Sequence, residues 1–187
     1  MIVLAIGVIA FAVFHLLPAI PAAKSALKAR TGEEIYGPVF GGISVIALAL
    51  IVLGWRSSGF APVYDPADWG RYVNFVLMAL AFMCLGIFIF RGRLRQTLRY
   101  PLAIGVLLWS SGHLLANGDL ASLILFGGFS VYAVTYLIAG VVNSVRPSPE
   151  VRSGHDILSI VIGLALYGAM TQLHPLVTGV PILVLTK

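Results

Sequence analysis

Charged side chains are scarce in this chain, since Asp, Glu, Lys and Arg together make up 10% of its 187 residues. Soluble globular domains carry about 25% charged residues. Hydrophobic residues make up 59% of the chain, so too little polar surface remains to face water on all sides. The composition excludes a soluble domain and predicts one integral membrane domain over residues 1–187.

Cysteine is almost absent, with Cys84 as its single occurrence. One cysteine excludes an internal disulfide and a cysteine-ligated iron–sulfur cluster, and no C-x-x-C-H stretch exists to attach haem covalently. The formal net charge is +5, yet no basic patch is interleaved with aromatic residues. We therefore expect the lipid bilayer, and no nucleic acid, as the partner of the basic residues.

Long apolar stretches are present instead, and each approaches the roughly 20 residues that a helix needs to cross a membrane. None contains Asp, Glu, Lys or Arg, and the short Asn117-Gly118-Asp119 turn joins two of them as an antiparallel hairpin. The stretches are Met1–Leu17, Tyr36–Trp55, Tyr72–Phe90, Tyr100–Ala116, Leu120–Val142 and Ile157–Val177. The predicted fold class is all-α, a polytopic helical bundle with about six transmembrane helices.

Basic residues are distributed unevenly between the two sides of this predicted bundle. Nine follow the first, third and fifth stretches, namely Lys24, Lys28, Arg30, Arg91, Arg93, Arg95, Arg99, Arg146 and Arg152. Three lie on the opposite side, namely Arg56, Arg71 and Lys187. The positive-inside rule predicts a bacterial inner (plasma) membrane protein with the nine in the cytoplasm and both termini in the periplasm. Because no positive charge precedes the first stretch, we expect it to be retained as a helix and not cleaved as a signal peptide.

Histidine is the polar side chain that stands out within the spans. The lack of charged residues there argues against a proton-coupled transporter. His15, His113 and His174 lie within or near the ends of three stretches, whereas His155 lies in a connector beside Asp156. Each of the three can simply bond to a neighbouring helix, but imidazole is also a standard axial ligand of haem iron.

Two histidine pairs are compatible with one iron. His15 and His113 lie on antiparallel helices with Cα atoms offset by about 13 Å, and each ring leans back toward the midplane. His113 and His174 lie on parallel helices in the same half of the membrane and form a rival pair. His174-Pro175 is equally interpretable as a helix end. Asn74 is expected to bond a neighbouring helix, and Gly41-Gly42 and Gly127-Gly128 are expected at close helix contacts.

The blocks around the histidines carry a resemblance to a known family. Arg99-Tyr100-Pro101, the following LAIGVLLWSSG, and His113-Leu114-Leu115-Ala116-Asn117-Gly118-Asp119 resemble the signature of the NnrU family. FHLLPAIPAA around His15, then Gly32-Glu33 and Tyr36, are similar to it as well. The family includes bacterial membrane proteins associated with denitrification and nitric oxide metabolism, and the 15-cis-ζ-carotene isomerase, a membrane enzyme with haem b.

The resemblance implies particular roles for matched positions. The isomerase's proposed iron ligands match His15 and His113, and a later His-Pro matches His174-Pro175. Two positions depart from the isomerase: Tyr100 stands where it has histidine, and Ser110 where it has cysteine. These departures weaken the expectation of isomerase activity and leave the ligand pair intact.

Three functions follow as hypotheses. The first is an NnrU-like membrane protein that binds haem b between His15 and His113, with nitric oxide as a small gaseous ligand, in nitric oxide or nitrite metabolism. The second is a haem-dependent cis–trans isomerase of a hydrophobic polyene such as ζ-carotene. The third is a membrane assembly factor without a cofactor, in which the histidines only join helices.

Overall fold

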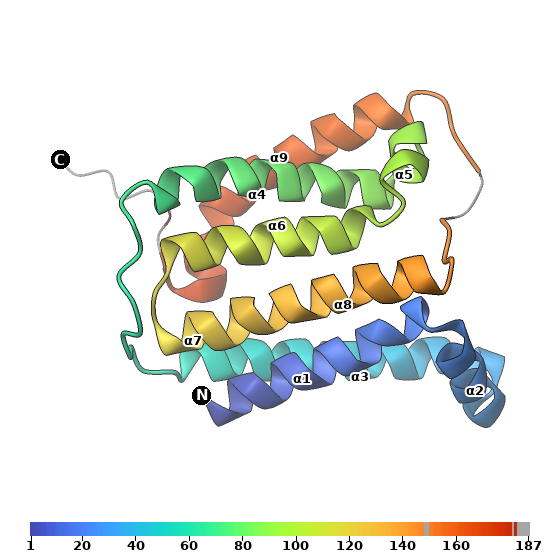
Figure 1. The fold of residues 1–187 in the computed structure, drawn as a ribbon, viewed down its shortest axis with the longest axis horizontal. Coiled ribbons are helices and arrows are strands. Elements are labelled where there is room, and N and C mark those ends of the chain that lie inside the picture. Colours follow the sequence, from blue (N-terminus) through green and yellow to red (C-terminus); the bar gives the residue numbers. More distant parts are fainter. Residues whose placement is uncertain (148–149, 181, 183–187) are drawn as a thin grey trace.

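The computed structural model describes residues 1–147, 150–180 and 182, and most of the described chain is helical (Figure 1). The long elements are α1 (Ile2–Leu16), α3 (Glu33–Arg56), α4 (Gly70–Ile89), α6 (Pro101–Ala116), α8 (Gly128–Val142) and α9 (His155–Thr178). The short ones are η1 (Leu17–Ala19), α2 (Pro21–Thr31), α5 (Arg93–Leu98), α7 (Leu120–Ser122) and the π-helical η2 (Leu123–Gly127). The described residues contain no β-strand, so the predicted all-α class is confirmed.

The long helices run roughly along one direction and form two groups (Figure 1). One group contains α1, α3 and α8, and the other contains α4, α6 and α9. Helix α1 packs on α3, while α4 packs on both α6 and α9. The contact between α6 and α8 joins the two groups into one bundle.

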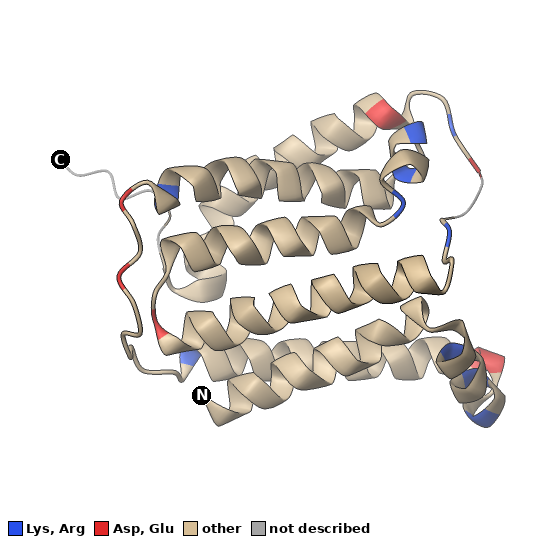
Figure 2. Ribbon diagram, viewed as in Figure 1, with Lys and Arg blue, Asp and Glu red and all other residues tan. Residues whose placement is uncertain are grey.

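The length and apolar character of the helices indicate that this bundle is a membrane protein. Within the described chain, five segments are long and apolar enough to cross a membrane: Ile2–Ala19, Glu33–Arg56, Gly70–Ile89, Leu120–Val142 and His155–Thr178. Helix α6 is shorter, at 16 residues or about 24 Å. All six predicted stretches are therefore helical, and the one that forms α6 is the shortest apolar segment. Lys and Arg gather mainly at the end of the bundle away from the N-terminus (Figure 2).

Two short helices lie in segments that were predicted only as connectors. Helix α2 buries none of its residues and carries Lys24, Lys28 and Arg30. Pro21 begins it and Gly32, with φ +85°, follows its last residue. Helix α5 likewise lacks buried residues. Both are polar helices beside the bundle, which hydrophobic periodicity does not detect.

Glycine permits the close approach of α4 and α9. A Cβ at Gly86 would overlap the carbonyl oxygen of Ser159, and one at Gly163 would lie 2.6 Å from the carbonyl oxygen of Phe82. The prediction that both glycine pairs lie at close helix contacts was largely wrong. Gly41 and Gly42 face open space, whereas Gly128 does pack closely, against Val8.

The loop over residues 57–69 forms hydrogen bonds with the C-terminal end of α6 and the turn that follows it. The amides of Val63 and Tyr64 donate to the carbonyl oxygen of Gly118 at 2.8 and 3.0 Å. The Tyr64 hydroxyl donates to the carbonyl oxygens of Asn117, at 2.7 Å, and Leu114. Burial, and to a lesser extent the negative charge of Asp119, raise the pKa of this hydroxyl above its ordinary value. The predicted hairpin turn is thus also the anchor of this loop.

Candidate functional site: a histidine pair between two cavities

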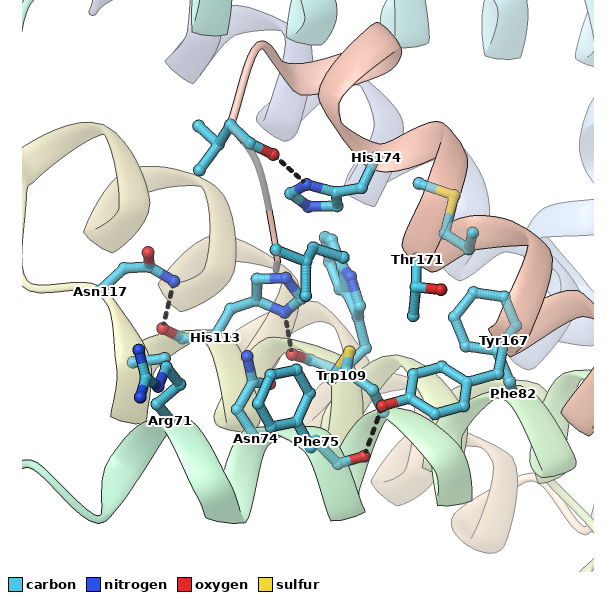
Figure 3. A pocket seen from close by; sticks show the side chains of 15 residues that line it. Arg71, Asn74, Phe75, Phe82, Trp109, His113, Asn117, Tyr167, Thr171 and His174 are labelled. Atoms are coloured by element: carbon cyan, nitrogen blue, oxygen red, sulfur yellow. Dashed lines mark hydrogen bonds between the residues drawn. The ribbon is translucent and has the colours of Figure 1, made fainter. Parts of the chain in front are cut away.

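His113 and His174 lie next to each other near one end of the bundle. Their ring centroids are 6.5 Å apart and the ring planes differ by 19°. His113 comes from the last turn of α6, and His174 lies just before the last turn of α9. Figure 3 shows the two rings facing each other across the space between these helices. Of the two predicted pairs, this is the one that the structure brings together.

Each ring is held through Nδ1 by a backbone carbonyl. His113 Nδ1 lies 2.9 Å from the carbonyl oxygen of Trp109, one turn earlier on α6. His174 Nδ1 lies 2.8 Å from the carbonyl oxygen of Val180, beyond the end of α9. A carbonyl oxygen can only accept, so both Nδ1 atoms carry the hydrogen. The lone pair of each imidazole therefore lies on Nε2, the tautomer suited to binding a metal.

Aromatic rings orient His113 further. It stacks on Phe126 with centroids 4.4 Å apart and planes at 21°, and it lies 5.4 Å from the ring of Trp109. Phe126 belongs to the π-helical turn η2, which adds one residue to the turn. Such π turns often occur at functional sites. Here the turn supplies the surface against which the His113 ring lies.

Two cavities, of about 230 and 270 Å³, flank the histidine pair. They share six wall residues: Trp109, His113, Asn117, Met170, His174 and Val180. The first cavity also has polar groups in its wall, from Arg71, Asn74 and Tyr167. The second is lined mainly by aliphatic and aromatic side chains. One flat, largely apolar molecule lying against the histidines would extend into both.

Asn74, in the wall of the first cavity, has an unsatisfied acceptor. Its Oδ1 is buried and has no hydrogen-bond partner among the described residues. The expected bond from Asn74 to a neighbouring helix is therefore not formed by this atom. A buried unpaired acceptor is costly, so this atom is a candidate contact for a donor on a bound molecule.

His15 lies at the opposite end of the bundle and faces a different cavity. That cavity, of about 400 Å³, is also lined by Arg95, Arg99 and Tyr100. The His15 ring stacks on Phe11 at 3.7 Å, and its Nδ1 lies 2.9 Å from the carbonyl oxygen of Phe11. As expected, the His15 ring points toward the N-terminal end of α1, but it reaches only as far as Phe11, one helical turn away. The structure does not bring His15 and His113 to one cavity.

The two positions that depart from the isomerase pattern lie away from the histidine pair. Ser110 is fully buried, and its hydroxyl is 2.8 Å from that of Ser130. It does not line either flanking cavity. The Tyr100 hydroxyl donates to the carbonyl oxygen of Val145 at 2.9 Å, in the cavity of His15.

The donor set restricts the kind of metal that this site can hold. Among the described residues, no group of three or more His, Cys, Asp or Glu side chains is arranged to bind a metal ion. Zinc sites use three or four protein ligands, so two imidazoles alone are too few. Two imidazoles are sufficient where a macrocycle supplies the other positions, as in a haem.

Sequence reasoning missed the aromatic surroundings of the pair. Trp109 precedes His113 by one helical turn, a spacing that could have identified it. Phe126, Tyr167 and Met170 come from helices whose relative rotation the sequence does not fix.

Comparison with known proteins gives a family match. A family model described as NnrU protein matches residues 3–182, nearly the whole chain. No curated protein shows a significant match, and neither does any solved structure.

Proposed function

The chain belongs to the NnrU family, and on that premise we propose that it holds one b-type haem between His113 and His174. The observation that carries this proposal is the 6.5 Å pairing of two imidazoles whose Nε2 atoms are both free to act as ligands. Following the family resemblance, we propose a role in nitric oxide or nitrite metabolism.

The walls of the two cavities favour a large flat ligand with a polar edge. Each cavity alone is below the roughly 300–1,000 Å³ typical of ligand sites, but the two share the histidine pair. Trp109 and Phe126 provide apolar surface for a macrocycle. Arg71, in the wall of the first cavity, supplies a cation for a ligand carboxylate, and Asn74 supplies an acceptor.

A haem held here would supply a one-electron couple and a site for a small gas such as nitric oxide. The chain treats its two imidazoles differently. His113 is fixed by a carbonyl of its own helix and by stacking on Phe126. His174 is held by Val180, in the segment after α9. The contact that holds His174 therefore lies outside its own helix, whereas the one that holds His113 lies within α6.

We infer a location in a bacterial inner membrane with both termini in the periplasm. The support is the excess of Lys and Arg at the end of the bundle opposite the N-terminus (Figure 2). The histidine pair then lies in the periplasmic half of the membrane.

Isomerisation of a polyene is a second candidate, favoured by the apolar second cavity beside His174. Leu48, Val52 and Leu125 in its wall suit a hydrocarbon chain. The burial of Ser110 away from the cavities weighs against a mechanism like that of the isomerase.

The test is the haem content and spectrum of the full chain, purified in detergent from cells supplied with a haem precursor. We expect one b-type haem per chain by the pyridine haemochrome method, with the sharp reduced bands of a six-coordinate low-spin iron. Conversion of a ζ-carotene isomer by the reduced protein would favour the second candidate. A colourless protein would contradict the proposed haem and favour the third hypothesis, a membrane assembly factor without a cofactor.

A further inference from the structure

The cavity of about 400 Å³ around His15 lies at the other end of the bundle from the histidine pair, and the proposed haem leaves it unused. We propose that it binds the phosphodiester headgroup of an anionic phospholipid. The inference is independent of the proposed haem site.

Positive charge without a matching negative charge is the first reason. Arg95, Arg99 and Arg146 line the cavity, and no Asp or Glu is among its described lining residues. The Nε of Arg99 donates to the carbonyl oxygen of Val145 at 2.9 Å, which fixes the guanidinium without neutralising it. The Arg95 guanidinium lies 5.4 Å from the ring centre of Phe88. Neither arginine forms an ion pair with a described carboxylate, so an anionic group is the missing partner.

Unpaired hydrogen-bond donors in the same wall are the second reason. The Tyr132 side chain is only 8% exposed, yet its hydroxyl has no hydrogen-bond partner among the described residues. The hydroxyl of Tyr136, a half-buried residue, likewise has no hydrogen-bond partner among the described residues. Both side chains line the cavity, so a phosphate oxygen there would accept hydrogen bonds from these hydroxyls.

The start of α6 adds further donors. Pro101 is its first residue, and no side chain caps this end. Leu102 and Ala103 both line the cavity, and amides in the first turn of a helix have no partner within the helix. Such an end attracts phosphate, because its amides and its dipole both favour negative charge.

Apolar side chains at the cavity mouth favour a lipid over a free anion. Phe40, Phe88 and Leu102 belong to the wall, and Phe88 and Leu102 are 39% and 36% exposed on the outside of the bundle. Acyl chains can lie along these side chains while the headgroup reaches the arginines. The cavity also lies at the end where Lys and Arg gather, the side on which anionic lipids attract basic residues.

The experiment measures binding of short-chain phosphatidylglycerol and phosphatidylcholine to the detergent-purified full chain by titration calorimetry. Arg95→Gln removes one cavity charge, and Arg93→Gln, on the same short helix but outside this cavity, is the matched control. Tyr132→Phe removes one unpaired hydroxyl with little change in shape. We expect preference for phosphatidylglycerol, about fivefold weaker binding in Arg95→Gln, and none of this loss in Arg93→Gln.

Equal binding of the two lipids, or an equal loss in both arginine variants, would overturn the proposal. Displacement of phosphatidylglycerol by an equal concentration of inorganic phosphate would assign the cavity to free anions instead. The haem spectrum is recorded on the same samples. Because this cavity does not contain His113 or His174, that spectrum should stay unchanged in all three variants.

Discussion

Backbone carbonyls decide which nitrogen of each histidine is available as a ligand. In both His113 and His174 a backbone carbonyl oxygen accepts a hydrogen bond from Nδ1–H, which leaves Nε2 free. The two carbonyls have different origins. That of Trp109 is part of α6, whereas that of Val180 follows Gly179, whose φ of +80° ends α9. Helix α9 continues past His174-Pro175 to Thr178, so the alternative interpretation of this pair as a helix end is wrong.

Thr178 tests how His174 is positioned. Its hydroxyl oxygen lies 3.1 Å from His174 Nδ1 and donates to the carbonyl oxygen of His174 at 2.9 Å. Thr178→Val keeps the shape and removes these two contacts, together with the hydrogen bond that the Val180 amide donates to the same oxygen at 3.1 Å. We expect haem to remain bound with a dissociation constant about tenfold higher, measured by transfer of haem to an acceptor protein. Thr135→Val, on an exposed part of α8, is the control, and an equal loss there would contradict the role of Thr178.

At this scale the sequence identifies the histidines as candidates but leaves their pairing open. His113 and His174 both stand out because imidazole is rare within the spans. Whether His15 or His174 joins His113 depends on how far each ring reaches along its helix. Stacking of His15 on Phe11 limits that reach to one turn, and sequence spacing does not predict such a contact.

Among the elements, the contact of α4 with α9 controls the position of His174. Gly86→Ala inserts a methyl group against the backbone of α9, and overpacking costs about 1–3 kcal/mol. We expect a lower Tm in detergent and weaker haem binding, because α9 is displaced. Gly168→Ala is the matched control, since a Cβ there meets nothing within 4 Å. Equal behaviour of the two variants would show that the close packing is unimportant.

The loop over residues 57–69 stabilises the end of α6 through Tyr64. Tyr64→Phe removes hydrogen bonds to Asn117 and Leu114, with an expected loss of about 1 kcal/mol at neutral pH. Because the folded protein raises the pKa of Tyr64, the hydroxyl stabilises the fold below its ordinary pKa, about 10. This contribution disappears as the pH rises through the raised pKa.

Thermal unfolding of wild type and Tyr64→Phe at a series of pH values provides the measurement. The difference in Tm between them should shrink above pH of about 10. A difference that stays constant or grows there would contradict this role of the hydroxyl.

Element type and order were largely predictable, because long apolar stretches without charge have few alternatives in a membrane. The π turn at Leu123–Gly127 was not, since it interrupts a stretch that reads as one uniform helix. The helices α2 and α5 were missed because their residues are polar and lie outside the core.

For the whole molecule, the arrangement separates two sites along the bundle axis. The histidine pair comes from near the ends of α6 and α9, whereas the arginine-lined cavity includes residues of α5 and of the start of α6. Figure 1 shows that these parts of the helices lie at opposite ends of the bundle. The sequence predicted that most Lys and Arg would gather at one end of the bundle, and Figure 2 shows this distribution. It could not predict the cavities, which depend on how the two groups of helices meet.

Membrane orientation is testable with introduced cysteines in a Cys84→Ala background. Ser58→Cys lies in the loop over residues 57–69, and Ser153→Cys lies in the connector before α9. We expect an impermeant thiol reagent to label Ser58→Cys in cells with a permeable outer membrane, and Ser153→Cys only after lysis. The reverse pattern would contradict the inferred orientation.

The most direct test of the histidine pair compares the oxidised and reduced absorption spectra of His113→Ala, His174→Ala and His15→Ala, purified in the same way. If His113 and His174 are the ligands, both of their variants lose haem or its six-coordinate bands, and His15→Ala keeps the wild-type spectrum. Loss of those bands in His15→Ala, with His174→Ala unchanged, would contradict the pairing and assign the iron to His15 and His113.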